Sequence, residues 1–590
     1  MVMNLEKVGR LVSAFDHSRR KLLPFRERRL AMVRQFVGGS WSDGGAPDRV
    51  PVNFLEMALN IYRRQVAARA PRIIVRSKNG DNVSFADDLE IAVNLAIEDM
   101  RFDDTMRKWV LEAMFGMGIL KVGLAPSSQK EVMGFTHDPG QPFADVVDFE
   151  DFVFDITAKR WDQVQFCGNR YSLPLEAIKD LKMFPKKEAV AATDRRNTNE
   201  GGDETIATLV DDGGSAYSNQ TYMELVELWD IWLPYDNVVA TFQTSPDGGI
   251  DAREPLRVVE WDGPEGGPYH LLSFGDIPGQ IMPLPPAALM IDLHELGNRV
   301  FRKLGRQADR QKTITLVASS NQDDGRRISA ANDGDAIAVD RPEATKEIRY
   351  GGVDQAGLAF FQQLRQLTSY FGGNLETLGG LNNATNTASQ EQLVKGQATM
   401  RISDMQERAT DAATKVIKTI SYYMWTDPVR AYRIPKKIPG TDMIIQSDLK
   451  PERRDGEFLD YAIEIIPFSM QSRTPSERLQ TAMQIMQTYI LPMAPLLQQR
   501  GLVPDIEAFL KMSAELSGAP EVMDLVKKVE PQEMMQGPVE DGGSAQPPAG
   551  PSSTTRTNIR ADRGGDSLGK QDAAIAAMMN GAAGSAGGKN

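Results

Sequence analysis

The feature that most constrains the fold of this chain is a pair of amphipathic helices separated by a short β-rich insertion. Residues 286–312 predict one helix after a proline-rich stretch, residues 354–371 predict a second, and the turn-rich residues 313–353 lie between them. An apolar stripe follows the first helix at helical spacing: Leu289, Leu293, Leu296, Val300 and Leu304. The second helix has its own: Phe360, Leu364, Leu367 and Phe371. The sequence therefore predicts two amphipathic rods that flank a small β module.

The length and the charge of the chain limit its organisation and its partners. At 590 residues it is several times a typical domain length, so we expect more than one packed unit. Its formal net charge is −13. A chain with this charge has no whole-molecule attraction for nucleic acid or for an anionic membrane. Any DNA is expected to be held loosely, or touched at a few local basic spots.

The cysteine content and the hydropathy pattern predict a soluble protein made in a reducing cytoplasm. Cys167 is the one cysteine, so no intrachain disulfide can form, and we expect it to be a small buried apolar residue. Glu6 and Lys7 come before any apolar run long enough for a signal peptide. No uncharged apolar stretch approaches the roughly 20 residues that a bilayer crossing needs.

The first half of the chain predicts mixed α and β structure. Residues 4–37 have the pattern of a basic amphipathic helical segment, which we expect to be interrupted at Pro24. The stretches 146–155 and 222–234 are rich in β-branched and aromatic residues and predict strands. Together with the helices farther along the chain, these strands place the protein in the α+β class.

The second half of the chain is mostly helical in pattern. Ser389 and Gln392 form a capping box for a long helix that is expected to run to about residue 425. A strand follows over 460–470, and helices are predicted between residues 474 and 517. Beyond residue 530 the sequence has almost no large apolar residues, so we expect this tail to be disordered.

No catalytic, metal or cofactor site is predicted. His294 and Glu295 begin like a zinc-protease helix, but Asn298 stands where the second imidazole ligand would be. His294 is therefore expected at a helix surface or an interface. Residues 564–571 have the Walker A glycine and lysine spacing, yet Gln571 replaces the Ser or Thr that holds magnesium. The adjacent carboxylates of two pairs are expected in solvated surface: Asp87 with Asp88, and Asp323 with Asp324.

The order of the predicted elements resembles the portal proteins of tailed double-stranded DNA phages, particularly the short-tailed ones. The resemblance covers about residues 50–520. MRKWVLEAMFGMGILKVGL (106–124) is similar to the family's helix into a G-x-G strand, and VVDFEDFVFDITAKRWDQVQF (146–166) to its strand with an Asp-containing turn. YMELVELWDIWLP (222–234) resembles the strand with a Glu-x-Trp core. IPGQIMPLPPAALMIDLHELGNRVFRKL (277–304) resembles the Pro/Gly entry into a long helix that carries Asn298.

The resemblance implies a twelvefold structural ring at the unique capsid vertex, with a channel for genome packaging and ejection and no enzymatic activity. Its regions would be an N-terminal region and wing (1–285), a first stem helix (286–312), a small α/β clip (313–353), a second stem helix (354–371), a tunnel loop (372–388), a long helix and the rest of the wing (389–470), a helical crown (471–530) and a disordered tail (531–590). The family's longer coiled C-terminal barrel is not evident, because the tail lacks heptads.

The implied partners are other copies of the chain, the terminase large subunit that supplies the energy, head-closure or tail-adaptor proteins, and capsid and scaffolding proteins. Double-stranded DNA would pass through the channel without sequence-specific contacts, and no membrane or cofactor is involved. The protein would be made in the host cytoplasm and end in the virion. Twelve copies at −13 carry 12 × −13 = −156 charges, which suits a conduit that must not retain DNA.

Three groups of residues would serve this role. The tunnel loop would present Asn374, Glu376, Asn382, Asn383, Thr385 and Asn386, whose short polar side chains are mostly suited to weak backbone contacts, although the loop could be only a flexible connector. The clip would dock the motor and later an adaptor through Asp323, Asp324, Arg326, Arg327, Lys346 and Arg349, for which ordinary solvation is the alternative.

The third group is a basic row on the first stem helix, predicted opposite its apolar stripe: Arg299, Lys303, Arg306 and Arg310. The row could face the channel and damp the motion of DNA, or it could pair with acidic groups of a neighbouring subunit. We favour the subunit interface, because twelve close-packed helices need their charges matched. Two other functions stay open for the whole chain: another ring or adaptor protein of the head–tail junction, and a metal-independent hydrolase of the virion.

Overall fold

The computed structural model divides the chain into two compact units, Met1–Thr474 and Pro475–Asn590. It describes residues 5–38, 52–67, 69–78, 80–125, 130–132, 135–137, 140–180, 184, 190–192, 223–251, 254–316, 322–331, 346–350, 352–378, 388–437, 444–454, 456–466, 469–470, 475–494, 509 and 513. Within this part the chain mixes helices with antiparallel sheets, which confirms the predicted α+β class.

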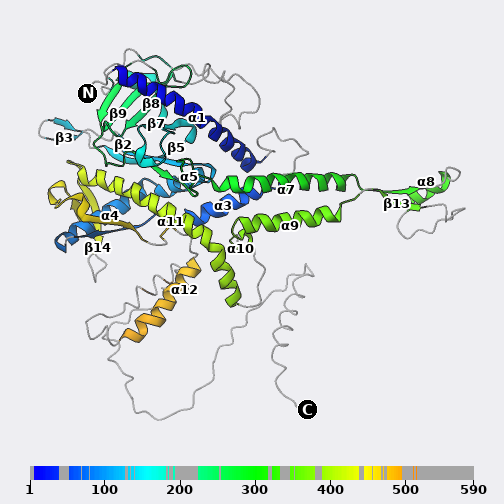
Figure 1. The fold of residues 1–590 in the computed structure, drawn as a ribbon. Coiled ribbons are helices and arrows are strands. Elements are labelled where there is room, and N and C mark those ends of the chain that lie inside the picture. Colours follow the sequence, from blue (N-terminus) through cyan, green and yellow to red (C-terminus); the bar gives the residue numbers. More distant parts are fainter. Residues whose placement is uncertain are drawn as a thin grey trace, which may run out of the picture. The chain divides into compact units, whose positions relative to one another are not determined.

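Two antiparallel sheets form one half of the first unit (Figure 1). The five-stranded sheet has the order β10 (Arg257–Glu260), β9 (Val238–Gln243), β8 (Leu225–Leu233), β7 (Cys167–Pro174) and β6 (Phe152–Phe154). The three-stranded sheet has the order β11 (Tyr269–Leu272), β2 (Gly118–Ala125) and β5 (Gln141–Val147). The strand predicted over 222–234 is confirmed as β8, whereas 146–155 contains the end of β5 and the whole of β6 with a 3-10 turn at Phe149–Asp151 between them. Cys167 is fully buried opposite Trp232, as expected.

The long N-terminal helix α1 (Leu5–Val37) covers the five-stranded sheet through Val8, Phe15 and Leu22. The Phe15 ring meets the edge of Trp229 with 4.9 Å between ring centroids. The predicted interruption at Pro24 is wrong, because the helix continues through this residue. Pro24 removes one backbone donor, but buried side chains anchor the helix to the sheet on both sides of it.

A layer of helices and short β ribbons forms the other half of the first unit. Its helices are α3 (Phe54–Val66), α4 (Val83–Asp99), α5 (Phe102–Phe115) and the long α11 (Ala388–Thr426). Two ribbons flank them, β1 (Ile73–Ser77) with β16 (Tyr461–Ile465), and β14 (Tyr432–Lys437) with β15 (Ile444–Leu449). The smaller elements are β3 (Lys130–Val132), β4 (Phe135–His137) and α6 (Leu175–Asp180). The long helix predicted after the capping box is confirmed, and its second half is buried in the largest core.

One of the predicted surface carboxylates is buried instead. Asp88 on α4 is 4% exposed. Lys436 Nζ on β14 lies 2.8 Å from its Oδ1, and Arg453 lies 3.7 Å from its Oδ2. The two cations, more than 340 residues away in sequence, compensate the buried charge. The expectation of a solvated pair therefore holds for Asp87, which is exposed, and fails for Asp88.

His294 is also buried rather than at a surface, with 2% exposure. The Asn298 amide donates to its Nε2 over 3.0 Å, which fixes the ring in the form that accepts at this nitrogen. Burial, with a smaller contribution from Arg302, lowers the pKa of His294 to about 4. Among the described residues, no three His, Cys, Asp or Glu side chains are placed to hold a metal ion.

The neutral His294 predicts a loss of stability in mild acid. Its pKa is lower in the folded chain than in the unfolded chain, so the unfolded chain binds the proton more tightly and stability falls as the pH drops below about 6.5. We expect His294→Gln, which keeps an acceptor, to remove about 1 kcal/mol of the stability lost between pH 7 and pH 5.5. Urea unfolding at both pH values measures this difference. His17→Gln on the exposed side of α1 is the control, and an equal effect there would contradict the assignment.

The second unit is described over residues 475–494 and at residues 509 and 513. Its helix α12 (Pro475–Ile485) continues as a π-helical stretch over Met486–Ile490. Pro475 occupies the first position of the helix, where proline is favoured. Of the helix predicted near 504–517, the structure describes Phe509 and Ser513, both with helical backbone, and the predicted disordered tail lies outside the described residues. None of the helices in the described part of the chain combines the length and the apolarity that a membrane crossing requires.

Candidate assembly surface on a helical hairpin

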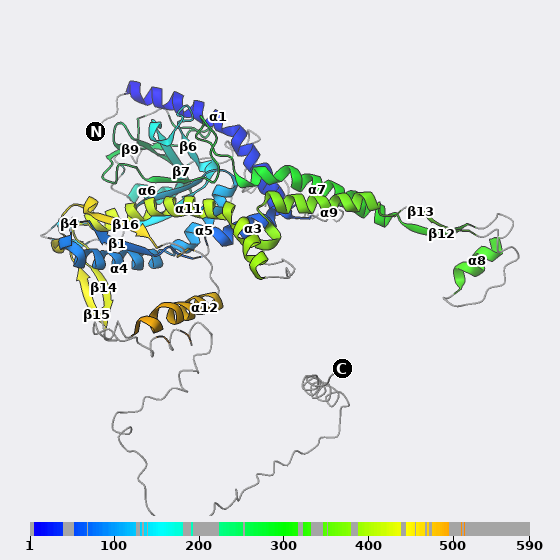
Figure 2. The ribbon, with the colours of Figure 1, turned by 60° about the horizontal axis from the view of Figure 1, so that its bottom comes forward.

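The two predicted rods form an antiparallel hairpin. Helices α7 (Pro286–Asp309) and α9 (Gln355–Phe371) lie side by side in both views (Figures 1 and 2). Small residues allow the close approach: a Cβ on Gly297 would lie 3.1 Å from Leu364, and a Cβ on Gly357 would lie 3.1 Å from Leu304. The first rod is three residues shorter than predicted, because Lys312 already belongs to a strand.

Helix α3 holds the hairpin at its base through three contacts. The side-chain oxygen of Asn298 accepts from the backbone N–H of Val52 over 2.9 Å, which makes Asn298 a link between α7 and the start of α3. Phe54 packs against Phe361 with 6.1 Å between ring centroids. At the end of α9, the Tyr62 hydroxyl donates to the carbonyl of Gly372 over 2.6 Å.

Of the apolar stripe predicted on α7, only Leu304 lies on the face that packs inside the chain. The buried side chains of α7 are Pro286, Ala287, Met290, His294, Asn298 and Leu304, together with Gly297. Leu289 is 50% exposed, and Leu293, Leu296 and Val300 are half-buried. The prediction selected the wrong face because small and polar residues make the close helix contacts, while the larger side chains stand beside them.

Helix α9 differs from its prediction in the same way. Of its four predicted apolar residues only Leu364 is buried, whereas Phe360, Leu367 and Phe371 are 46%, 42% and 56% exposed. Thr368 takes the second buried position and donates its hydroxyl to the Leu364 carbonyl over 2.9 Å. Both helices therefore carry a second apolar stripe that the described residues of the first unit do not cover fully.

The two uncovered stripes lie on the same side of the hairpin. With about 100° per residue, the stripe on each helix is rotated roughly 70° from the α7–α9 contact, in the direction away from Phe54 of α3. The stripes therefore join into one surface, which we call the apolar surface of the hairpin: Leu289, Leu293, Leu296 and Val300 of α7 with Phe360, Leu367 and Phe371 of α9. Exposed apolar patches are found at protein–protein and membrane contacts and at ligand grooves.

The basic row lies beside this surface, on the side of α7 away from α9. Arg299, Lys303, Arg306 and Arg310 are all exposed. Arg306 donates to the Arg302 carbonyl over 3.4 Å. Within the described residues, none of the four side chains forms an ion pair. At about 100° per residue, the row lies next to the predicted apolar stripe of α7, not opposite it as predicted, and points away from the buried face of the helix.

Beyond the hairpin, the predicted clip contains a two-stranded ribbon and a helix. Strands β12 (Lys312–Leu316) and β13 (Lys346–Tyr350) pair antiparallel, and α8 (Gln322–Ala330) follows β12 in sequence. Asp323 and Arg326 are 88% and 82% exposed at the side chain, 3.9 Å apart, and Arg327 is exposed. Asp324 belongs to α8, and Lys346 and Arg349 belong to β13; their side chains are outside the described part.

The predicted tunnel loop begins with a tight turn and a short helix. Asn374 has a left-handed backbone, with φ of 59°, and donates its N–H to the Ser369 carbonyl over 2.7 Å. Helix α10 (Leu375–Leu378) follows and contains Glu376, so the prediction of a loop throughout is wrong here. Leu375 is buried and drives this turn back onto the core. Asn382, Asn383, Thr385 and Asn386 lie outside the described residues.

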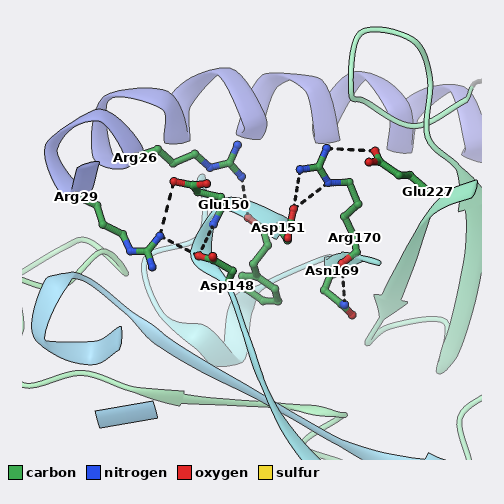
Figure 3. A network of polar contacts seen from close by, with 9 residues as sticks. Arg26, Arg29, Asp148, Glu150, Asp151, Asn169, Arg170 and Glu227 are labelled. Atoms are coloured by element: carbon green, nitrogen blue, oxygen red, sulfur yellow. Dashed lines mark hydrogen bonds and ion pairs between the residues drawn. The ribbon is translucent and has the colours of Figure 1, made fainter. Parts of the chain in front are cut away.

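A buried charge network lies beneath α1 and was not predicted from the sequence (Figure 3). Arg29 is 4% exposed and pairs with Asp148 at 2.8 Å and with Glu112. Arg26 donates to the Phe152 carbonyl over 3.1 Å, and burial, reinforced by Arg170, lowers its pKa to about 10. These arginines therefore bind within the chain. The available signal was spacing, because Arg29 follows the buried Leu22 by seven residues on one helix face.

A second buried network joins the two sheets. Lys121 on β2 lies 2.9 Å from the side-chain oxygen of Asn169 and 3.1 Å from Asp230 Oδ2, both on the five-stranded sheet. Tyr269 on β11 donates its hydroxyl to the same Asn169 oxygen over 2.7 Å. A lone lysine between two sheets needs these acceptors, so the network fixes how the sheets pack rather than forming an open reactive site.

Comparison with known proteins does not decide between the functions that this geometry permits. No protein-family model matches the chain, and no curated protein is significantly similar to it.

Proposed function

We propose that the chain assembles into the portal ring of a tailed double-stranded DNA phage, with a channel through which the genome is packaged and released. The observation that carries the proposal is the apolar surface of the hairpin. Four of its seven residues are exposed, namely Leu289 of α7 with Phe360, Leu367 and Phe371 of α9. The hairpin that carries the surface is held at one end by α3. The proposal assigns a second copy of the chain as the occupant of this surface.

Repetition of the chain explains three features together. Copies placed side by side would cover the apolar surface, would repeat the exposed basic row at regular intervals, and would bring the ribbon β12–β13 and helix α8 into a ring at the far end of the hairpin. In a portal these parts are the stem and the clip. The clip would present exposed Asp323, Arg326 and Arg327 to the terminase motor and to a head-closure or adaptor protein.

The buried networks suit a rigid structural part. Arg29 joins α1 to the sheet, and Lys121 joins the two sheets, so the body that carries the hairpin is internally cross-linked by charge. A ring that resists the pressure and traction of packaged DNA needs such rigid subunits. Another ring or adaptor protein of the head–tail junction is the second candidate function, and a metal-independent hydrolase of the virion is the third.

Electron microscopy of the purified chain in negative stain tests the proposal directly. We expect rings with a central hole, and native mass spectrometry is expected to give a single closed stoichiometry near twelve copies. A monomer that hydrolyses a cell-wall or ester substrate would overturn the proposal in favour of the hydrolase. Small rings that bind a purified portal from another phage would favour the adaptor.

A further inference from the structure

We infer that the basic row on α7 contacts the phosphate backbone of a double-stranded nucleic acid and does not form an interface between subunits. The inference rests on the proposed function for its setting, and it reverses the interface assignment favoured from the sequence. Three observations carry it: the orientation of the row, the composition of the neighbouring helix, and the residues that lie between its members.

The orientation of the row separates it from the assembly surface. With about 100° per residue, Arg299, Lys303, Arg306 and Arg310 point almost opposite to the buried face of α7, which carries Gly297 and Leu304. The apolar surface lies between the two. A neighbour that covers the apolar surface can therefore do so without covering the row.

The composition of α9 rules it out as the partner of the row. An interface that buried four cations would need carboxylates opposite them, since an unpaired buried charge is strongly unfavourable. Gln355–Phe371 contains no Asp or Glu, and its single charged residue is Arg365. The surface that α9 offers to a neighbouring hairpin is made of amides and apolar side chains. It matches the apolar surface of α7 and cannot neutralise the row.

The chemistry of the row selects a duplex backbone over a single strand. The row extends over about 16 Å of helix, nearly half of the roughly 34 Å that one turn of duplex DNA spans. Proteins that hold single strands interleave cations with aromatic side chains, on which bases stack. The one aromatic residue between Arg299 and Arg310 is Phe301, which packs on Phe361 at 5.4 Å between ring centroids. The row thus presents charge without stacking platforms.

The local charge around the row supports binding of a phosphate backbone even though the whole chain is acidic. Between residues 299 and 310 there are five basic residues and one acidic residue, a local charge of 5 − 1 = +4, whereas the whole chain carries −13. Phosphate contacts of this kind release counterions and depend steeply on salt. Weak attraction at the row within an acidic channel would hold DNA without trapping it.

The test uses the full-length chain and a fluorescent 30-base-pair duplex of arbitrary sequence. The variant R299Q/K303Q/R306Q/R310Q removes the row. Its matched control, R10Q/R20Q/K21Q/R28Q, removes four exposed cations of helix α1 and changes the net charge equally. We expect the row variant to bind the duplex more than tenfold more weakly at 0.1 M salt and to have a shallower salt dependence. The control is expected to bind like the unmodified chain, and so is the charge-preserving variant R299K/R306K/R310K.

The oligomeric state, measured on the same samples by native mass spectrometry, separates the two proposals. Loss of assembly in the row variant would overturn the inference, because the row would then be an interface. Equal weakening in the row variant and its control would also overturn it, because the effect would reflect net charge alone. Tighter binding of a single-stranded oligonucleotide than of the duplex at the row would also overturn the inference. An unmodified chain that is monomeric yet binds the duplex through the row would contradict the ring and keep the inference.

Discussion

Replacing Leu289 and Leu367 with glutamate is expected to leave the chain folded and to abolish its assembly. Both side chains belong to the apolar surface of the hairpin, one on each helix, and they are 50% and 42% exposed. A glutamate at an exposed helix position remains hydrated in the single chain, so the fold tolerates it. In an assembly that buries the surface, each copy would bury two unpaired carboxylates, and repetition around a ring multiplies this cost.

The measurement is native mass spectrometry together with light scattering at a fixed protein concentration. We expect the oligomer of the unmodified chain to give way to monomers, a change of at least about a hundredfold in the dissociation constant if each buried carboxylate costs only about 1.4 kcal/mol. Tyr235→Glu with Leu459→Glu is the control, because these residues are 76% and 73% exposed at other sites. Intact rings in the first variant would show that the apolar surface faces something other than a second copy.

The elements of the hairpin were predictable from the sequence, but the face on which it packs was not. Apolar spacing and the proline entry located both rods to within three residues. Spacing alone selected the larger aliphatic residues as the buried stripe. The actual contact uses Gly297 and Gly357, which have no side chain to separate the two helices. The advantage of a glycine at these positions depends on how closely α7 and α9, which are far apart in sequence, approach each other. Periodicity in one helix contains no information about that distance.

The buried charges were unpredictable for a related reason. Asp88 and Arg29 have the sequence environments of solvated residues, and their burial is possible only because partners arrive from remote elements. Asp88 meets Lys436, and Arg29 meets Asp148. A single sequence gives the local pattern of such residues, whereas their compensation is a property of the tertiary fold. Cys167 was predictable because an isolated thiol needs no partner in a core.

Replacing Arg29 with methionine is expected to destabilise the first unit by about 3 kcal/mol. The arginine pairs with Glu112 and Asp148, and Glu150 lies 3.9 Å from it. Burial opposes the charge of Arg29, but these carboxylates outweigh it and raise its pKa. Methionine fills the volume and leaves the carboxylates without a cation. Arg10→Met is the control, since Arg10 is exposed and its pair with Glu6 should contribute about 0.5 kcal/mol or less.

A lower pH and a second substitution should each reduce the destabilisation by Arg29→Met if that destabilisation comes from the unpaired carboxylates rather than from altered packing. Burial raises the pKa of Glu112 in the folded chain, and Arg29 opposes that rise, so removal of Arg29 leaves the folded chain with a higher proton affinity than the unfolded chain. The sign of the linkage is then fixed: protonation favours the folded state, and the deficit of Arg29→Met relative to the unmodified chain should shrink as the pH is lowered from 7 to 5. The double variant Arg29→Met, Glu112→Gln should recover stability at pH 7 and lose this pH dependence. Urea unfolding followed by tryptophan fluorescence measures all three chains, and a deficit that is constant in pH and unchanged by Glu112→Gln would assign the role of Arg29 to packing.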